Sequence, residues 1–107
     1  MKISSLNETV RGWFIGNFNP SVYKTEDFEV GILTHYKGQI WPKHYHKEAV
    51  EINVLIIGSM KINDILIKPN DIFIIEKNEV VVPEFLEDCT IVCVKSPSVL
   101  GDKYEVE

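Results

Sequence analysis

Short apolar runs rich in isoleucine and valine, separated by turn residues, are the feature that most restricts how this chain can fold. Runs of this length and spacing predict the strands of an all-β sandwich or barrel. The sequence shows no convincing helix beyond a short turn near Ser4–Arg11, where Ser5 and Glu8 are spaced as a capping box. We therefore expect an all-β fold with little or no helix and with strands at Asp27–Leu33, Gln39–His46, Val50–Ile57, Met60–Ile62, Ile65–Ile67, Asp71–Ile75, Glu79–Val82 and Thr90–Val94.

Turn residues separate the later strands. Asn63 and Asp64 both tolerate a positive φ, so they predict a two-residue hairpin between Met60–Ile62 and Ile65–Ile67. Pro69-Asn70 predicts a second turn. These short connections favour antiparallel pairing of neighbouring strands.

The chain has 107 residues, which is the size of one domain. The strand pattern places a barrel at about residues 29–95, between an N-terminal arm at 1–26 and a C-terminal tail at 97–107. Strands such as VEINVLII are apolar on both faces and need cover on both sides. We therefore expect the outer face to be covered, either by the arm residues Trp13-Phe14-Ile15 or in a homodimer.

The formal net charge is −5, and the lysines and arginines are scattered along the sequence. A nucleic acid or an anionic membrane surface requires a clustered basic face, so we expect neither as a partner. The absence of a signal-like segment or a long apolar run favours a cytoplasmic protein that binds a small molecule. Cys89 and Cys93 would lie about 13 Å apart along one strand, too far for a disulfide, and we expect them to be buried as apolar residues.

Residues 44–51, HYHKEAVE, carry the polar side chains with the clearest chemical meaning. His44 and His46 would share one face of a strand, about 6.6 Å apart. Glu51 has the wrong parity for the same strand, so the chain must turn at residues 47–49 to bring it to the histidines. With that turn, the three side chains converge, and Glu51, Asn53, Leu55 and Ile57 share the inner face.

Two neutral imidazoles and one carboxylate suit Fe(II), Mn(II), Zn(II) or Ni(II) and leave coordination positions open for a ligand. Two other interpretations of the same residues remain. The histidines could be hydrogen-bonded in the mouth of the barrel, or they could act without a metal as an acid–base pair whose pKa is adjusted by Glu51.

The glycines that flank this stretch add a resemblance. Residues 38–58, GQIWPKHYHKEAVEINVLIIG, match the first cupin motif, G(X)5HXH(X)3–4E(X)6G, at every specified position. The chain resembles a small single-domain cupin over roughly residues 29–95. The resemblance implies a cupin-type double-stranded β-helix, or jelly-roll barrel, and a divalent metal ion held by His44, His46 and Glu51.

The second cupin motif is poorly matched. Asn70 and Asn78 stand at its glycine positions, where both can adopt a positive φ. Val81 stands where the resemblance expects the last histidine ligand. His35 could replace that ligand only if it faces inward, and we expect it at an edge or on the surface.

Several side chains are candidates for the wall of a ligand pocket. Asn53 should face inward beside Glu51, and Glu84 could reach the site from a later strand. Counting by twos from His44 puts Pro42 on the site face and Trp41 on the other, with Tyr45 pointing away. The aromatic candidates are Tyr36, Trp41, Tyr45, Phe73 and Phe85.

The function that these features favour is that of a small metal-binding cupin, an enzyme acting on a polar small molecule such as a sugar or sugar acid. Its reaction would be of the isomerase, lyase or oxygenase type. One alternative is a cupin that binds a small ligand without catalysis. Another is a metal-free nucleotide-sugar isomerase, because HYHK resembles the HxHK of that group, with His44 and His46 as acid and base.

Overall fold

A computed structural model describes residues 1–106 and contains ten β-strands and a single turn of 3₁₀ helix. The 3₁₀ turn, Leu6–Glu8, follows Ser5, whose hydroxyl accepts a hydrogen bond from the backbone N–H of Asn7. The strands are β1 Trp13–Ile15, β2 Glu29–His35, β3 His44–Tyr45, β4 Val50–Ile57, β5 Met60–Ile62, β6 Ile65–Ile67, β7 Ile72–Ile75, β8 Pro83–Phe85, β9 Cys89–Ser96 and β10 Tyr104–Glu105. The prediction of an all-β fold is confirmed. No helix among the described residues has the length and apolar character needed to cross a membrane.

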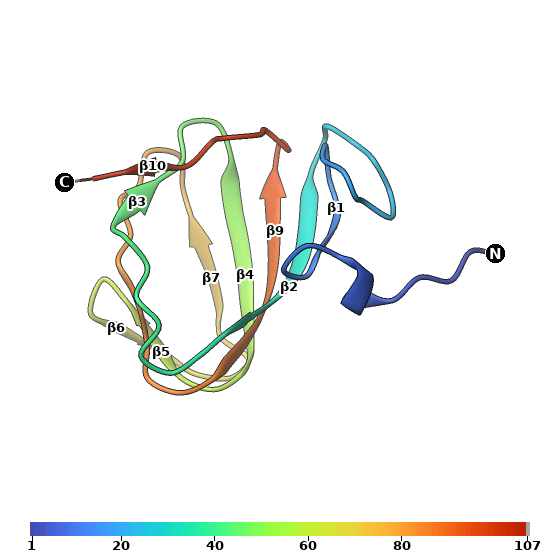
Figure 1. Ribbon diagram of the computed structural model, residues 1–107. Helices are drawn as coiled ribbons and strands as arrows, with labels where there is room; N and C mark the ends of the chain where they lie inside the picture. Colours follow the sequence, from blue (N-terminus) through green and yellow to red (C-terminus); the bar gives the residue numbers. More distant parts are fainter. Residues whose placement is uncertain (107) are drawn as a thin grey trace.

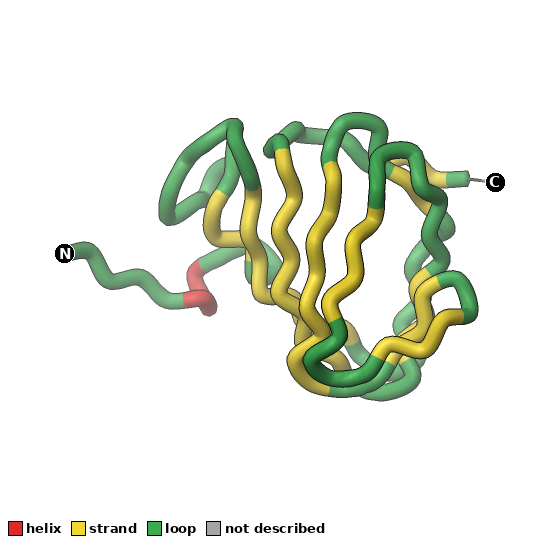
Figure 2. The backbone as a smooth tube through the Cα atoms, turned by 180° about the vertical axis from the view of Figure 1, so that it is seen from behind, coloured by secondary structure: helices red, strands yellow, loops and turns green. Residues whose placement is uncertain are grey.

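Three antiparallel sheets make up the barrel. The largest has the strand order β1-β2-β9-β4-β7, and it lies opposite the small sheets β6-β5-β8 and β10-β3 (Figure 1). The view from behind shows the strands of the large sheet side by side, with the small sheets on the other side of the barrel (Figure 2). β4 lies between β9 and β7 in the large sheet, so strands distant in sequence pair at the centre of the fold.

The central strands lie where the apolar runs predict them. β4, β5 and β6 have the predicted bounds. Asn63 and Asp64 form the turn between β5 and β6 with φ angles of 50° and 66°. Asn70 and Asn78, at the glycine positions of the second motif, also have positive φ angles, 75° and 64°. Their short polar side chains tolerate this conformation at low cost.

Two predicted strands are wrong in extent or position. Only His44–Tyr45 of the predicted strand 39–46 is a strand, because Pro42 has no N–H to donate to a ladder. Residues 79–82 are not a strand, and β8 begins at Pro83 instead. Two hydrogen-bonding groups of that segment are taken up by Asn63, whose side chain donates to the Val80 carbonyl and accepts from the Val82 N–H.

Both ends of the chain join the barrel. β1 from the arm pairs with β2, and β10 from the tail pairs with β3. The residues before the 3₁₀ turn extend away from the barrel (Figure 1), and Met1 and Ile3 are exposed. The predicted arm thus extends the large sheet at its edge, and the tail covers the strand that carries His44.

The core lies between the sheets and consists of the buried side chains of Leu55, Met60, Ile67, Phe85, Cys89 and Ile91. Cys89 and Cys93 are buried and unpaired, as predicted. Asn53 and Leu55 point inward from β4, but the register shifts between Leu55 and Ile57. This bulge turns Ile57 outward, where its side chain is 60% exposed, so its predicted inner position is wrong.

Candidate functional site

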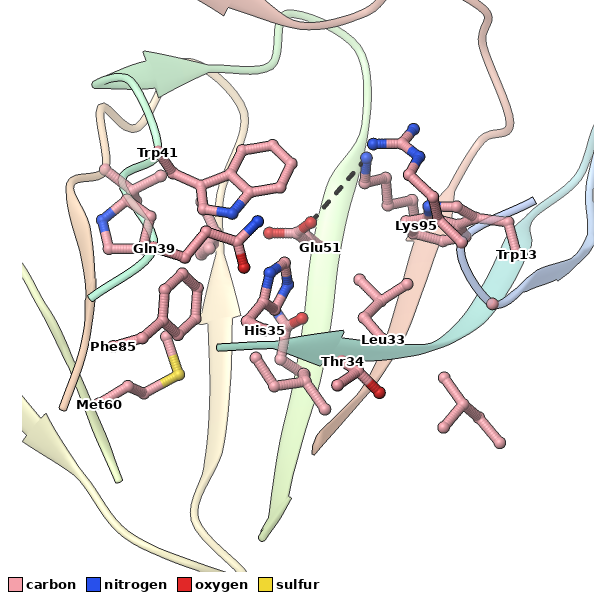
Figure 3. A pocket seen from close by; sticks show the side chains of 18 of the residues that line it. Trp13, Leu33, Thr34, His35, Gln39, Trp41, Glu51, Met60, Phe85 and Lys95 are labelled. Carbon is pink, nitrogen blue, oxygen red and sulfur yellow. Dashed lines mark ion pairs between the residues drawn. The ribbon is translucent and has the colours of Figure 1, made fainter. Parts of the chain in front are cut away.

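A cavity of about 600 Å³ opens between the large sheet and the segments opposite it. Its wall contains all three histidines of the chain together with Glu51 and Asn53. Figure 3 shows the inward-pointing side chains, with His35, Trp41 and Glu51 directed toward the same space. The size of this cavity is within the range of small-molecule binding sites.

His44 and His46 project from β3 and the residue that follows it. Both side chains are buried, and their ring centroids are 5.5 Å apart with the ring planes nearly perpendicular. Nδ1 of His44 lies 2.8 Å from the carbonyl oxygen of Pro42. That contact favours a proton on Nδ1 and leaves Nε2 as the nitrogen with a free lone pair.

His46 has the least satisfied side chain in the cavity wall. Only 2% of the residue is exposed, and neither ring nitrogen has a hydrogen-bond partner among the described residues. Burial, followed by the nearby positive charge of Lys95, lowers the pKa of His46. His46 is therefore neutral at pH 7, which is the form that can act as a base or as a metal ligand.

Glu51 lies on β4 and faces the cavity, as its register requires. One of its oxygens, Oε1, accepts a hydrogen bond of 3.3 Å from Sγ of Cys93 and lies 4.0 Å from Nζ of Lys95. Burial, and then the negative charge of Glu51, raise the pKa of the Cys93 thiol, so the thiol stays protonated and donates this hydrogen bond. The carboxylate is therefore held by β9 rather than by the histidines.

The side chains of His44, His46 and Glu51 are of the types that bind a divalent metal ion. Two imidazoles and a carboxylate share one cavity, and the unpaired nitrogens of His46 are available as ligands. Within residues 1–106, however, no group of three His, Cys, Asp or Glu side chains is close enough together to hold a metal ion. The predicted convergence of the three side chains is therefore not reached, and Glu51 would have to turn from Cys93 toward the histidines to complete a site.

The turn between the histidines and β4 is held by Asp102 from the C-terminal tail. Its carboxylate accepts backbone hydrogen bonds from Lys47 at 2.9 Å, Glu48 at 3.2 Å and Ala49 at 3.0 Å. Burial alone would raise the pKa of Asp102, but these three N–H donors outweigh it, and the pKa is lowered. The sequence predicted the turn but not the residue that secures it.

Within residues 1–106, the buried side-chain nitrogen and oxygen atoms that lack a hydrogen-bond partner all belong to residues of this cavity. Besides the two nitrogens of His46 they are Nδ1 of His35, Nε1 of Trp41 and Nδ2 of Asn53. Buried polar groups in folded proteins are nearly always hydrogen-bonded. Their concentration in one cavity indicates a place where a polar ligand supplies the missing partners.

Two sequence predictions about orientation are wrong. His35 lines the cavity instead of lying at an edge, stacked on Phe85 at 4.4 Å between ring centroids and edge-on to Trp41 at 5.4 Å. Burial is the main cause of its lowered pKa. Trp41 lines the cavity whereas Pro42 is exposed, because residues 39–43 are not a continuous strand and counting by twos does not apply to them.

The other candidates are divided between wall and surface. Asn53 and Phe73 line the cavity, and Tyr36 lies at its rim with 64% of its surface exposed. Tyr45 points away from the histidines and stacks on Tyr104, 5.5 Å between ring centroids. Glu84 is exposed on β8 and does not line the cavity, because the neighbouring Phe85 takes the inward position.

Val81, which stands where the second motif has a histidine ligand, holds β3 through its backbone. It is buried in the cavity wall, and its backbone exchanges hydrogen bonds of 3.1 and 2.8 Å with His44. The position that the second motif gives to a histidine is therefore next to His44 in space but apolar. Three charged residues of the cavity wall, Arg11, Lys95 and Lys103, were not predicted from the sequence.

Solved structures share this architecture. A protein with a double-stranded β-helix domain from Klebsiella pneumoniae aligns with 99% of this chain and 92% of its own, at 24% identity and a TM-score of 0.71. The DMSP lyase DddQ of Ruegeria pomeroyi aligns at 13% identity and a TM-score of 0.69 over 88% of this chain and 49% of its own. Ectoine synthase from P. lautus aligns at 15% identity and a TM-score of 0.69 over 100% and 91%. The chain has the cupin fold.

This fold was the one implied by the spacing of Gly38, His44, His46, Glu51 and Gly58. No protein-family model matches the sequence, and no curated protein does. At these identities the likeness extends to the double-stranded β-helix and no further. The fold itself supports many chemistries, so function has to be argued from the cavity.

Proposed function

We propose that this cupin-fold protein is a metal-dependent enzyme acting on a polar small molecule such as a sugar or sugar acid. The observation that supports this most directly is the buried pair His44 and His46 in a cavity of about 600 Å³, with both nitrogens of His46 unpaired. Proteins named as a lyase and a synthase share the fold, and this supports the proposal of an enzyme.

His44, His46 and Glu51 are the residues that would hold the metal. A divalent ion such as Fe, Mn, Zn or Ni would polarise a carbonyl or hydroxyl oxygen of the ligand. Side chains of the protein would bind and orient the ligand. The stacked rings of His35 and Phe85 and the indole of Trp41 form one wall that excludes water, and the Asn53 amide is placed to orient a hydroxyl group.

The metal content of tag-free protein, purified without added metal, tests this proposal. We expect close to one metal ion per chain by mass spectrometry in the parent. In the double variant His44→Ala/His46→Ala we expect occupancy below about a tenth of that, because two of the three ligands are lost. Glu84→Gln, an exposed carboxylate outside the cavity, is the control and should keep the metal.

A parent that is purified empty and takes up none of these ions in solution would contradict the metal site. Acid–base chemistry without a metal would then be the better account. One observation already supports that second candidate. The Glu51 carboxylate is hydrogen-bonded to Cys93 and lies near Lys95, and it is not bound to the histidines. In that case His44 or His46 would move the proton, or the cavity would bind its ligand without catalysis.

We also propose that a second copy of the chain covers the outer face of the large sheet. Two cross-strand rows lie on this face, and all their side chains are apolar and at least partly exposed: Val30, Val94, Ile52 and Ile74, then Ile32, Val92, Val54 and Ile72. No charged side chain stands in these rows, so two chains of net charge −5 can approach here without local repulsion.

Light scattering at micromolar concentration checks the dimer. We expect twice the chain mass of 12.3 kDa for the parent, and a single chain mass for Ile52→Lys/Ile74→Lys, which places two charges in the interface. Ile40→Lys is the matched control, because Ile40 is 91% exposed elsewhere and its replacement should leave the dimer intact. A parent that scatters as one chain would contradict the proposal.

A further inference from the structure

Three cations gather at the cavity although the chain as a whole is acidic. Arg11 comes from the turn before β1, Lys95 from β9, and Lys103 from the residue before β10. They are far apart in sequence, and only the pairing of the two chain ends with the barrel brings them together. A cluster of positive charge at the mouth of a cavity in a chain of net charge −5 raises the local concentration of anions.

The backbone at Arg11 is held in an uncommon conformation. Arg11 has a φ of 54° and Gly12 a φ of 91°, and the turn is closed by a 3.1 Å hydrogen bond from the Trp13 N–H to the Val10 carbonyl. A positive φ is unfavourable for arginine, and such residues cluster at functional sites. The unfavourable φ therefore occurs at the turn that places Arg11 in the cavity wall.

The other two cations lie over aromatic rings of the cavity wall. Nζ of Lys103 is 3.9 Å from the ring centre of Trp41, and Nζ of Lys95 is 4.9 Å from that of Trp13. Lys95 also lies 3.7 Å from Glu29 and 4.0 Å from Glu51. In the described part of the chain, neither Arg11 nor Lys103 has a carboxylate within 4.0 Å. Burial, and then the charge of Lys95, lower the pKa of Lys103, with a further contribution from Arg11.

An unused hydrogen-bond donor lies next to Lys103. The indole Nε1 of Trp41 is buried and has no partner among the described residues, and Lys103 covers the same ring. In Figure 3 the indole nitrogen of Trp41 points into the cavity, toward the side-chain amide of Gln39 and the carboxylate of Glu51. A cation and a neutral N–H donor are thus available together, which is the combination that a carboxylate group accepts well.

We infer that Arg11, Lys95, Lys103 and the indole N–H of Trp41 form a subsite for the carboxylate of a small organic acid. This assignment rests on the proposed function and specifies its ligand class. Before any metal is bound, the three cations and the two carboxylates within 4.0 Å of Lys95, those of Glu29 and Glu51, sum to one net positive charge. One positive charge matches a carboxylate monoanion better than a phosphate monoester, which carries nearly two negative charges at pH 7.

Calorimetric titration of the parent with matched ligand pairs tests the subsite. Gluconate is compared with glucitol, and glycolate with ethylene glycol, since each pair differs mainly in the carboxylate. We expect saturable binding of at least one acid and binding at least tenfold weaker for its neutral counterpart. Glucose 6-phosphate, as a phosphate probe, should bind more weakly than gluconate.

Variants that remove one positive charge each then test whether Arg11 and Lys103 bind the carboxylate. Arg11→Gln and Lys103→Met should each weaken binding of the acid by about 5- to 10-fold, because each removes one charge-assisted contact. Lys77→Gln is the matched control, since Lys77 is exposed outside the cavity and its loss should change nothing. Circular dichroism confirms that the variants are folded.

Three outcomes would overturn the subsite. They are equal binding of acid and neutral partner, preference for the phosphate, and no binding of either acid by the parent. Metal content is measured on the same samples, so a parent that carries metal but ignores the carboxylate contradicts the subsite while leaving the metal site standing. A parent without metal that still discriminates through Arg11 and Lys103 contradicts the metal site alone.

Discussion

Replacing Asp102 with alanine is expected to lower the free energy of unfolding by about 3 kcal/mol, because the backbone N–H groups of Lys47, Glu48 and Ala49 lose their acceptor. In a domain of this size that loss lowers the melting temperature by roughly 10–20 °C. Thermal and urea unfolding measure both quantities. Glu105→Ala, an exposed carboxylate of the same tail, is the control and should shift stability by less than about 0.5 kcal/mol.

The same carboxylate predicts a dependence on pH. The pKa of Asp102 is lowered in the folded chain, so its contribution to stability is full above the ordinary value of 3.8 and is lost as the pH falls below it. In acid, once His46 is protonated, its positive charge also favours the charged form of Asp102. Asp102→Asn should therefore unfold with a flatter acid limb than the parent between about pH 5 and pH 2. Parallel acid limbs would show that the turn does not depend on this charge.

Replacing Gly58 with alanine is expected to have the second large effect, about 3 kcal/mol or more of lost stability. Gly58 has a φ of +97°, and a Cβ there would lie 2.3 Å from the carbonyl oxygen of Asp88 and 2.9 Å from Sγ of Cys89. The oxygen is backbone and cannot move aside without disturbing the start of β9. Strain from the positive φ adds to the clash.

Gly38→Ala is the matched comparison, because Gly38 is the first glycine of the same motif and has a positive φ of +77°, but nothing lies within 4 Å of its Cβ position. We expect it to cost only about 1 kcal/mol, from backbone conformation alone. The difference in unfolding free energy between the two variants then measures the crowding at Gly58. Equal losses would mean that backbone conformation accounts for both motif glycines.

The apolar pattern and the turn residues were sufficient to predict the fold class. β4, β5 and β6 have the predicted bounds because alternation, a strong turn at Asn63-Asp64 and the stop at Gly58 are all local signals. The spacing of two histidines, Glu51 and two glycines was sufficient to name the cupin fold. Local propensity and burial agree over this part of the chain, so its sequence carries the information directly.

Segments without regular pairing were predicted less well. Residues 39–43 and 79–82 look like strands, but Pro42 and the side chain of Asn63 divert their hydrogen bonds. As a result, the orientation of Trp41 could not be obtained by counting along the chain, and the bulge between Leu55 and Ile57 had the same effect on Ile57. Orientation follows the period of a strand only where the strand is continuous.

Taken alone, the sequence determined the all-β class, the central strands, the hairpin and the placing of His44, His46 and Glu51 in one region, because each depends on residues close together in the chain. The tertiary structure decided that His35 and Trp41 line the cavity, that Glu51 is bound by Cys93, and that Asp102 holds the turn. It also decided that Arg11, Lys95 and Lys103 meet at one mouth. Those contacts join residues tens of positions apart, and no local preference can specify which distant partner a buried polar group finds.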